Sequence, residues 1–170
     1  ALVIVYNDHV NRFFFDAYPT FALGVSDVFP QADEGWGTRP LPDLTGDPAL
    51  GWHVARSLVA DEFDPTICQE LAVDHGIYSV LPFLAEPPWT TPIVPLAVNV
   101  IQHPLPTPRR CFRLGQALRR AIDSHEADAR VVVIATGGMS HQLHGTDFGL
   151  LAPEWDNEFL DRLESDPDSL

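Results

Sequence analysis

Three short, mainly apolar runs lie at residues 2–6, 93–101 and 131–135. Runs of this length are typical of β-strands that are covered on both faces. The second run contains Pro95, which has no backbone N–H to donate and therefore interrupts the expected strand. A fourth, less clear strand is expected within residues 63–73.

Between these runs, apolar residues recur every three or four positions, which is the helical period. Helices are expected at about residues 48–60, 108–124 and from 153 onward. The first begins at Asp47-Pro48, an N-cap residue followed by proline at the first helical position. Alternating strands and helices predict an α/β fold with a mainly parallel sheet and flanking helices.

The chain length of 170 residues is sufficient for one domain with a sizeable core. The sequence opens without methionine, inside an expected strand, and stops one turn past an expected helix. We therefore expect residues 1–170 to be a fragment, lacking both ends, of a larger single-domain catalytic subunit.

Histidines follow the apolar runs in three places. Asn7-Asp8-His9 comes directly after the first run, and Asp74-His75-Gly76 follows residues 63–73. The third place is residues 136–145, where paired glycines precede His141 after the last run. Ligands of open α/β sheets bind at the carboxyl ends of strands, so we predict that His9, His75 and His141 converge on one metal-assisted site. Taken singly, the first two clusters could equally be ordinary turns.

Acidic residues near these histidines are further candidates. Asp74 is expected to orient the adjacent His75, because a carboxylate commonly fixes the tautomer of a functional histidine. Residues 29–48 are rich in proline, glycine and aspartate and are expected to form an ordered loop or lid. Asp33 and Glu34 in this loop could bind a metal, although adjacent acids in a loop are more often solvated.

The net charge of −14 comes from 24 acidic residues against 10 arginines, with no lysine. Such a charge repels phosphate backbones and anionic membranes, so nucleic-acid and membrane partners are not expected. The arginines concentrated in residues 108–124 are expected to pair with carboxylates. The two cysteines, Cys68 and Cys111, have no metal-binding spacing and are expected to be free thiols of a cytoplasmic protein.

Three histidines from separate segments fit a zinc hydrolase, a metal-free acid/base site or a non-haem iron site. A Ser-His-Asp hydrolase is the weakest option, because Ser140 is adjacent to His141 and no GxSxG sequence is present. Residue spacing does not choose among the other three.

Four motifs resemble one enzyme family in sequence and in order. They are Val5-Tyr6-Asn7-Asp8-His9, residues 32–37 (ADEGWG), Val73-Asp74-His75-Gly76 and residues 136–142 (TGGMSHQ). Together they resemble the class III extradiol ring-cleaving dioxygenases across essentially the whole chain. The resemblance is greatest to the catalytic beta subunits of the protocatechuate 4,5-dioxygenase branch, with the gallate dioxygenase branch close behind.

The resemblance implies a site with Fe(II) held by two histidines and one glutamate. It implies that His9 is one iron ligand, that His141 is the catalytic acid/base, and that His75 assists catalysis while hydrogen-bonding the substrate. Asn7, His75 and His141 would contact the substrate. The other metal ligands would lie outside this chain, so the fragment alone is expected to bind iron poorly and to be inactive.

The implied reaction is extradiol cleavage of a catecholic benzoate by O2, most simply protocatechuate 4,5-cleavage to a carboxymuconate semialdehyde. Gallate and 3-O-methylgallate are alternative substrates, and a small helical alpha subunit or a second copy of the chain is a possible partner. A protein of another class, a non-catalytic binding module on the same fold, would be expected to have lost the histidines that this chain retains.

Overall fold

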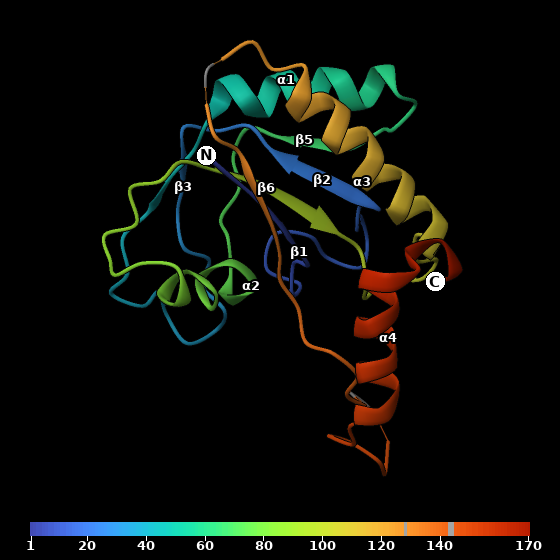
Figure 1. Ribbon diagram of the computed structural model, residues 1–170. Coiled ribbons are helices and arrows are strands. Elements are labelled where there is room, and N and C mark those ends of the chain that lie inside the picture. Colours follow the sequence, from blue (N-terminus) through green and yellow to red (C-terminus); the bar gives the residue numbers. More distant parts are fainter. Residues whose placement is uncertain (128, 143–144) are drawn as a thin grey trace. The chain divides into compact units, whose positions relative to one another are not determined.

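The structure is a computed structural model that describes residues 1–127, 129–142 and 145–170. The chain divides into two compact units, Ala1–Thr136 and Gly137–Leu170 (Figure 1). Leu143 and His144, which belong to the predicted 136–145 motif, lie outside the described residues. That residues 1–170 form one domain of a larger subunit stays a prediction.

A five-stranded sheet in the order β5-β2-β6-β1-β7 forms the centre of the first unit. The pairs β1–β6, β1–β7 and β2–β5 are parallel, and only β2–β6 among the sheet's pairs is antiparallel. The strands span Leu2–Tyr6 (β1), Phe21–Gly24 (β2), Thr66–Cys68 (β5), Ile93–Val98 (β6) and Val132–Ala135 (β7). This mainly parallel α/β architecture confirms the predicted fold class.

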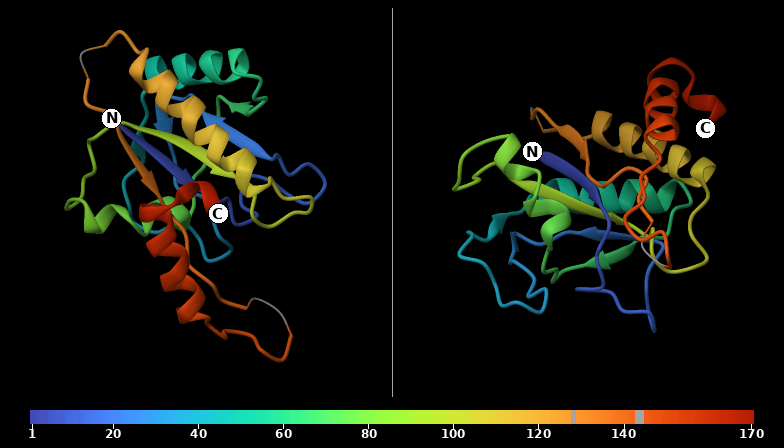
Figure 2. Two further views of the ribbon diagram at one scale, coloured as in Figure 1. Left: turned by 45° about the vertical axis from the view of Figure 1, so that its right-hand side comes forward. Right: turned by 90° about the horizontal axis from the view of Figure 1, so that it is seen from below.

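The strands β1, β6 and β7 point in the same direction, as the left view of Figure 2 shows. Tyr6 lies opposite Ala97, and Val5 lies opposite Ala135, so the three strands end at the same edge of the sheet. The segment that begins at Asn7 therefore leaves the sheet at its carboxyl edge, where open α/β sheets bind ligands.

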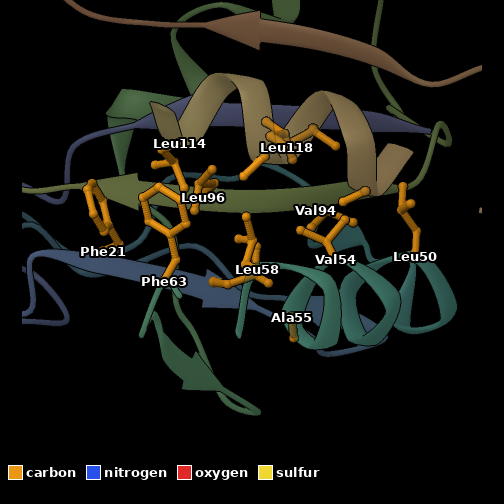
Figure 3. Packing of buried hydrophobic residues seen from close by; sticks show 14 of the residues in the cluster. Phe21, Leu50, Val54, Ala55, Leu58, Phe63, Val94, Leu96, Leu114 and Leu118 are labelled. Carbon is orange, nitrogen blue, oxygen red and sulfur yellow. The ribbon is translucent and has the colours of Figure 1, made fainter. Parts of the chain in front are cut away.

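Two helices, α1 (Pro48–Ala60) and α3 (Pro108–Asp123), pack against one face of this sheet (Figures 1 and 2). Their buried side chains meet alternate residues of the strands, because successive strand residues point to opposite faces. Figure 3 shows this core, which includes Leu50, Val54, Leu58, Val94, Leu96, Leu114 and Leu118.

The opposite face is covered by shorter elements. These are α2 (His75–Tyr78), the 3-10 helix η1 (Leu81–Phe83) and a two-stranded sheet of β3 (Val28–Phe29) and β4 (Leu44–Thr45). A second core cluster joins Ile4 and Tyr6 of β1 to Phe29, Val73 and Ile77. The short helix α2 is thereby held beside the end of β1.

The helices at 48–60 and 108–124 were predicted almost to the residue, whereas the strands differ in detail. Strand β2 was not expected, and the predicted strand within residues 63–73 is only three residues long. Pro95 does not interrupt β6. The pairing of β6 with β2 stops at Leu96, so it does not require the backbone N–H that Pro95 lacks. The neighbouring Gly24 also leaves room for the proline ring, because a Cβ there would lie 2.7 Å from Pro95 Cγ.

The second unit contains α4 (Pro153–Ser165) and the 3-10 helix η2 (Pro167–Ser169). Ser140 ties its loop to this helix: the Ser140 N–H donates to Asp156 Oδ1 (3.0 Å), and Ser140 Oγ accepts from the Ala152 N–H (2.8 Å). The hydroxyl of Ser140 therefore has a structural role. Among the described residues of either unit, none of the helices is long and apolar enough to cross a membrane.

Candidate functional site

Buried Asp8 organises the loop that carries His9. Its carboxylate accepts hydrogen bonds from the backbone N–H groups of Asn11, Arg12 and Phe13, and its carbonyl accepts one from the Tyr18 hydroxyl. The chain turns sharply inside this loop, where Val10 has a φ of 61°. A β-branched residue rarely adopts this left-handed conformation, so the loop holds local strain directly after His9.

Asp74 fixes the position of His9. Its Oδ2 accepts hydrogen bonds from the His9 N–H (2.8 Å), His9 Nδ1 (3.0 Å) and Asn11 Nδ2 (3.0 Å). Its Oδ1 accepts one from the Gly76 N–H (2.9 Å), which caps α2. The carboxylate is fully buried, and all these donors converge on it, so Asp74 is an orienting group and not a free metal ligand.

The Asp74–His9 pair shifts the pKa of both groups. Burial alone would raise the pKa of Asp74, but the hydrogen bonds from His9 and Asn11 outweigh it and lower that pKa. The hydrogen bond to Asp74 raises the pKa of His9, against an opposing effect of burial. A carboxylate can only accept, so His9 Nδ1 carries a proton and Nε2 is the nitrogen left to bind a ligand.

Asn7 lies at that free nitrogen. Its amide Nδ2 is 3.0 Å from His9 Nε2 and donates a hydrogen bond to it. In the neutral imidazole, the lone pair of His9 Nε2 therefore points toward the Asn7 amide, which lies at the carboxyl edge of the sheet. A ligand that binds His9 Nε2 would take the place of the Asn7 amide and leave that amide free to contact a neighbouring molecule.

Glu34 holds His75 in the same manner. One carboxylate oxygen accepts from the His75 N–H (3.0 Å), and the other lies 2.5 Å from His75 Nδ1. The loop of Glu34 reaches this position because backbone bonds attach it to Val73: the Ala32 N–H donates to the Val73 carbonyl, and the Val73 N–H donates to the Pro30 carbonyl, each at 2.9 Å.

The rings of His9 and His75 are stacked, with centroids 4.0 Å apart and planes inclined by 29°. Ligand atoms of His9, Asp74 and His75 all lie within 4.8 Å of one another, a spacing compatible with a metal ion. An imidazole nitrogen, however, binds a metal in its own ring plane at about 2.1 Å. Two nearly parallel rings at this separation cannot both do so with one ion, which favours a single ligand from this pair.

The structure therefore confirms that His9 and His75 come together, and it corrects the expected partner of His75. Asp74 orients His9 instead of its sequence neighbour, and Glu34 orients His75. The sequence indicates Glu34 only as a metal ligand or a solvated acid. No sequence signal joins two residues that are 41 positions apart in different loops; their contact follows from the attachment of the loop to Val73.

His141 lies in the second unit and is exposed. Its Nδ1 donates a hydrogen bond to the Met139 carbonyl at 3.1 Å, so its Nε2 is free to accept a proton. The predicted convergence of His141 with His9 and His75 stays a prediction.

A separate hollow of about 640 Å³ lies between α3 and the strands β1 and β7. Its lining is mainly aliphatic, including Val5, Leu96, Leu118 and Val133, and it contains no acid–histidine pair. His9 and His75 are not among the residues that line this hollow.

Comparison with known proteins identifies a family. Residues 1–169 match the family described as the catalytic LigB subunit of aromatic ring-opening dioxygenase. The chain belongs to this family. The family that the sequence motifs suggested is therefore confirmed.

Two dioxygenases are similar to this chain over most of its length. A gallate dioxygenase of Pseudomonas putida is 50% identical over 141 residues, which cover 82% of this chain and 42% of that protein. A 2,3-dihydroxyphenylpropionate/2,3-dihydroxicinnamic acid 1,2-dioxygenase of Burkholderia vietnamiensis is 34% identical over 142 residues, with 83% and 43% covered. The chain thus spans less than half the length of these relatives.

One solved structure supports the fold alone. The crystal structure of an uncharacterized protein from Escherichia coli K12 is similar with a TM-score of 0.56 and 22% identity. The similarity covers 97% of this chain and 58% of that protein.

Proposed function

We propose that the whole protein is an extradiol dioxygenase that opens the ring of a catecholic benzoate with O2 and non-haem Fe(II). The observation that carries this proposal is the pair of stacked histidines, each held by a carboxylate through Nδ1 and each presenting Nε2. Carboxylate–histidine pairs of this type are characteristic of metal-binding and acid/base histidines.

The donor set fits Fe(II). Imidazole nitrogen is a suitable ligand for iron, and His9 is held in the tautomer that leaves Nε2 free to bind it. His9 would be the ligand from this part of the chain, and further ligands are required to hold the ion. When bound, Fe(II) would supply Lewis acidity toward the catechol hydroxyls and the redox chemistry that O2 requires.

The other residues would act on the substrate and its protons. The Nε2 of His75, beside the ring of His9, would hydrogen-bond a catechol oxygen and exchange a proton with it. Once His9 binds iron, the Asn7 amide would be released to donate to the substrate. His141 would serve as the acid/base through its free Nε2.

Similarity to named relatives says more about the substrate class than the geometry of the site does. Protocatechuate is the substrate that the sequence motifs suggested, but the relative with 50% identity is named a gallate dioxygenase. Gallate is therefore the first substrate to test beside protocatechuate, with 3-O-methylgallate as a third. A small alpha subunit or a second copy of the chain would be the macromolecular partner.

The test is oxygen uptake by the whole protein, loaded with Fe(II) without oxygen, with each of these catechols. We expect His9→Ala to lose bound iron and His141→Ala to keep iron but turn over slowly. His125→Ala is the matched control, because His125 contacts His53 elsewhere on the first unit. Bound iron without oxygen consumption on any catechol would refute the dioxygenase and favour a binding module, whereas zinc with hydrolytic activity would favour a hydrolase.

A further inference from the structure

We propose that Glu34 is a positioning residue that sets the tautomer and ring orientation of His75. This role rests on the proposed function insofar as His75 exchanges a proton with the substrate. Glu34 lies in the loop between β3 and β4, far from His75 in sequence, and only the folded structure brings the two together.

The carboxylate of Glu34 forms a two-point contact with one residue. It accepts from the backbone N–H and from Nδ1 of His75, at 3.0 and 2.5 Å. A carboxylate has no proton to donate, so Nδ1 must carry the hydrogen and the lone pair of the neutral ring lies on Nε2. The backbone contact fixes the start of α2, and the side-chain contact fixes the ring relative to that backbone.

Exposure supports a positioning role. The side chain of Glu34 is 17% exposed, whereas that of His75 is 41% exposed. Water is thus largely kept from the carboxylate, while the imidazole remains accessible to a ligand. Because the ring of His75 lies on that of His9, a rotation of His75 would also uncover one face of His9.

The loop does not need the Glu34 side chain to keep its shape. Backbone bonds to Val73 attach its beginning, and Asp33 Oδ1 closes its turn by accepting from the Gly35 and Gly37 N–H groups, each at 2.9 Å. The two neighbouring acids therefore have different roles. Asp33 stabilises the turn of the loop, and Glu34 orients the ring of His75.

The decisive variant is Glu34→Gln. A glutamine has one carbonyl oxygen for two donors, so it can keep the bond to the His75 N–H only by turning its NH2 group toward Nδ1. Nδ1 must then accept, and the proton moves to Nε2. A role limited to capping α2 would be preserved in this variant, whereas the positioning role would be lost.

The first measurement is 15N NMR of the His75 ring in the metal-free whole protein, with the signal assigned by its absence in His75→Gln. We expect the Nδ1–H tautomer in the native protein and the Nε2–H tautomer, or a mixture, in Glu34→Gln. This measurement does not depend on enzymatic activity, so it tests the role of Glu34 even if the proposed dioxygenase function fails.

The second measurement is steady-state kinetics of the iron-loaded protein with gallate or protocatechuate. We expect kcat of Glu34→Gln to fall by about 10- to 100-fold, the range typical of lost carboxylate–histidine contacts, with KM and iron content nearly unchanged. Asp33→Ala is the control, since it loosens the same loop without contacting His75. An unchanged tautomer in Glu34→Gln, or equal changes in tautomer and kcat in Asp33→Ala, would overturn the proposal.

Discussion

Replacement of Asp74 by asparagine removes one negative charge at the point where the β1 loop meets α2. Asp74 is fully buried and accepts four hydrogen bonds, of which three reach Oδ2 and one reaches Oδ1. Asparagine can keep its carbonyl oxygen at the Oδ2 position. Its NH2 group then faces the N–H of Gly76, so two donors meet where a hydrogen bond was.

The expected loss of stability follows from these contacts. A buried donor without a partner costs about 1–3 kcal/mol, and each remaining bond weakens because its acceptor is no longer charged. The smaller cost of burying a neutral group offsets part of this loss. We expect Asp74→Asn to lower the free energy of unfolding by about 2–4 kcal/mol, a large share of the roughly 5–15 kcal/mol typical of a folded protein.

The pH dependence gives a second test of the same variant in the metal-free protein. The pKa of Asp74 is lowered by folding, so its contribution is present above its ordinary value of 3.8 and is lost as the pH falls through the folded pKa. The pKa of His9 is raised, so its contribution is complete below 6.5 and is lost as the pH rises through the folded pKa. The effect of Asp74→Asn should therefore be greater between about pH 4 and 6.5 than at pH 8 or above.

Urea unfolding across this pH range measures the effect, and Asp47→Asn is the control. Asp47 caps α1 through one oxygen, which accepts from the Leu50 N–H at 3.0 Å, and asparagine caps a helix equally well. We expect the control to change stability by less than about 0.5 kcal/mol. A loss below about 1 kcal/mol in Asp74→Asn, or the same loss in both variants, would contradict the central role of Asp74.

Four further predictions concern other residues of the first unit. Gly115→Ala should stabilise the protein by about 0.5–1 kcal/mol, because a Cβ in this exposed part of α3 meets nothing within 4 Å. Gly46→Ala should destabilise the protein by about 1–3 kcal/mol, because its Cβ would lie 2.0 Å from the Ser26 carbonyl oxygen. Val10→Gly should raise stability by about 1 kcal/mol through relief of the positive φ, and an unchanged or lower urea midpoint in that variant would argue against strain in the loop. Burial raises the pKa of Tyr78 from 10.0 to about 12, so the folded state favours the neutral phenol. The protein should therefore lose stability as the pH rises above 10. Spectrophotometric titration should detect the Tyr78 phenolate only near pH 12 or on unfolding.

Local sequence patterns were sufficient to predict most of the fold. The helices at 48–60 and 108–123 combine an apolar stripe with a proline start, and each signal is contained within a few turns. Strand β2 could not be found in this way, because its four residues follow an aromatic cluster and have no flanking pattern of their own. Its place depends on pairing with β5 and β6, which are distant in sequence.

The same distinction applies to the site. The meeting of His9 and His75 is confirmed, but the reason for expecting it was only half right. His9 does follow the carboxyl end of β1, whereas β5 runs antiparallel to β1, and His75 reaches the site because α2 packs beside the end of β1. The carboxylates that orient them were not assigned correctly, since sequence proximity suggested that Asp74 serves His75. The actual partners depend on where the loop of Glu34 is attached, and a single residue of displacement would change which oxygen reaches which nitrogen.

Several locally unfavourable features lie around His9. A β-branched residue with positive φ follows it, a buried carboxylate lies against it, and another imidazole is stacked on it. Each of these features costs free energy or requires compensation, and none is needed to close the sheet or to pack α1 and α3. Their common effect is to hold one nitrogen of His9 in a fixed direction at the carboxyl edge of the sheet. The contacts of Asp74 also stabilise the fold, but the positive φ of Val10 and the stacked imidazole add no such stability, and a fixed His9 nitrogen is what the proposed role of His9 as a metal ligand requires.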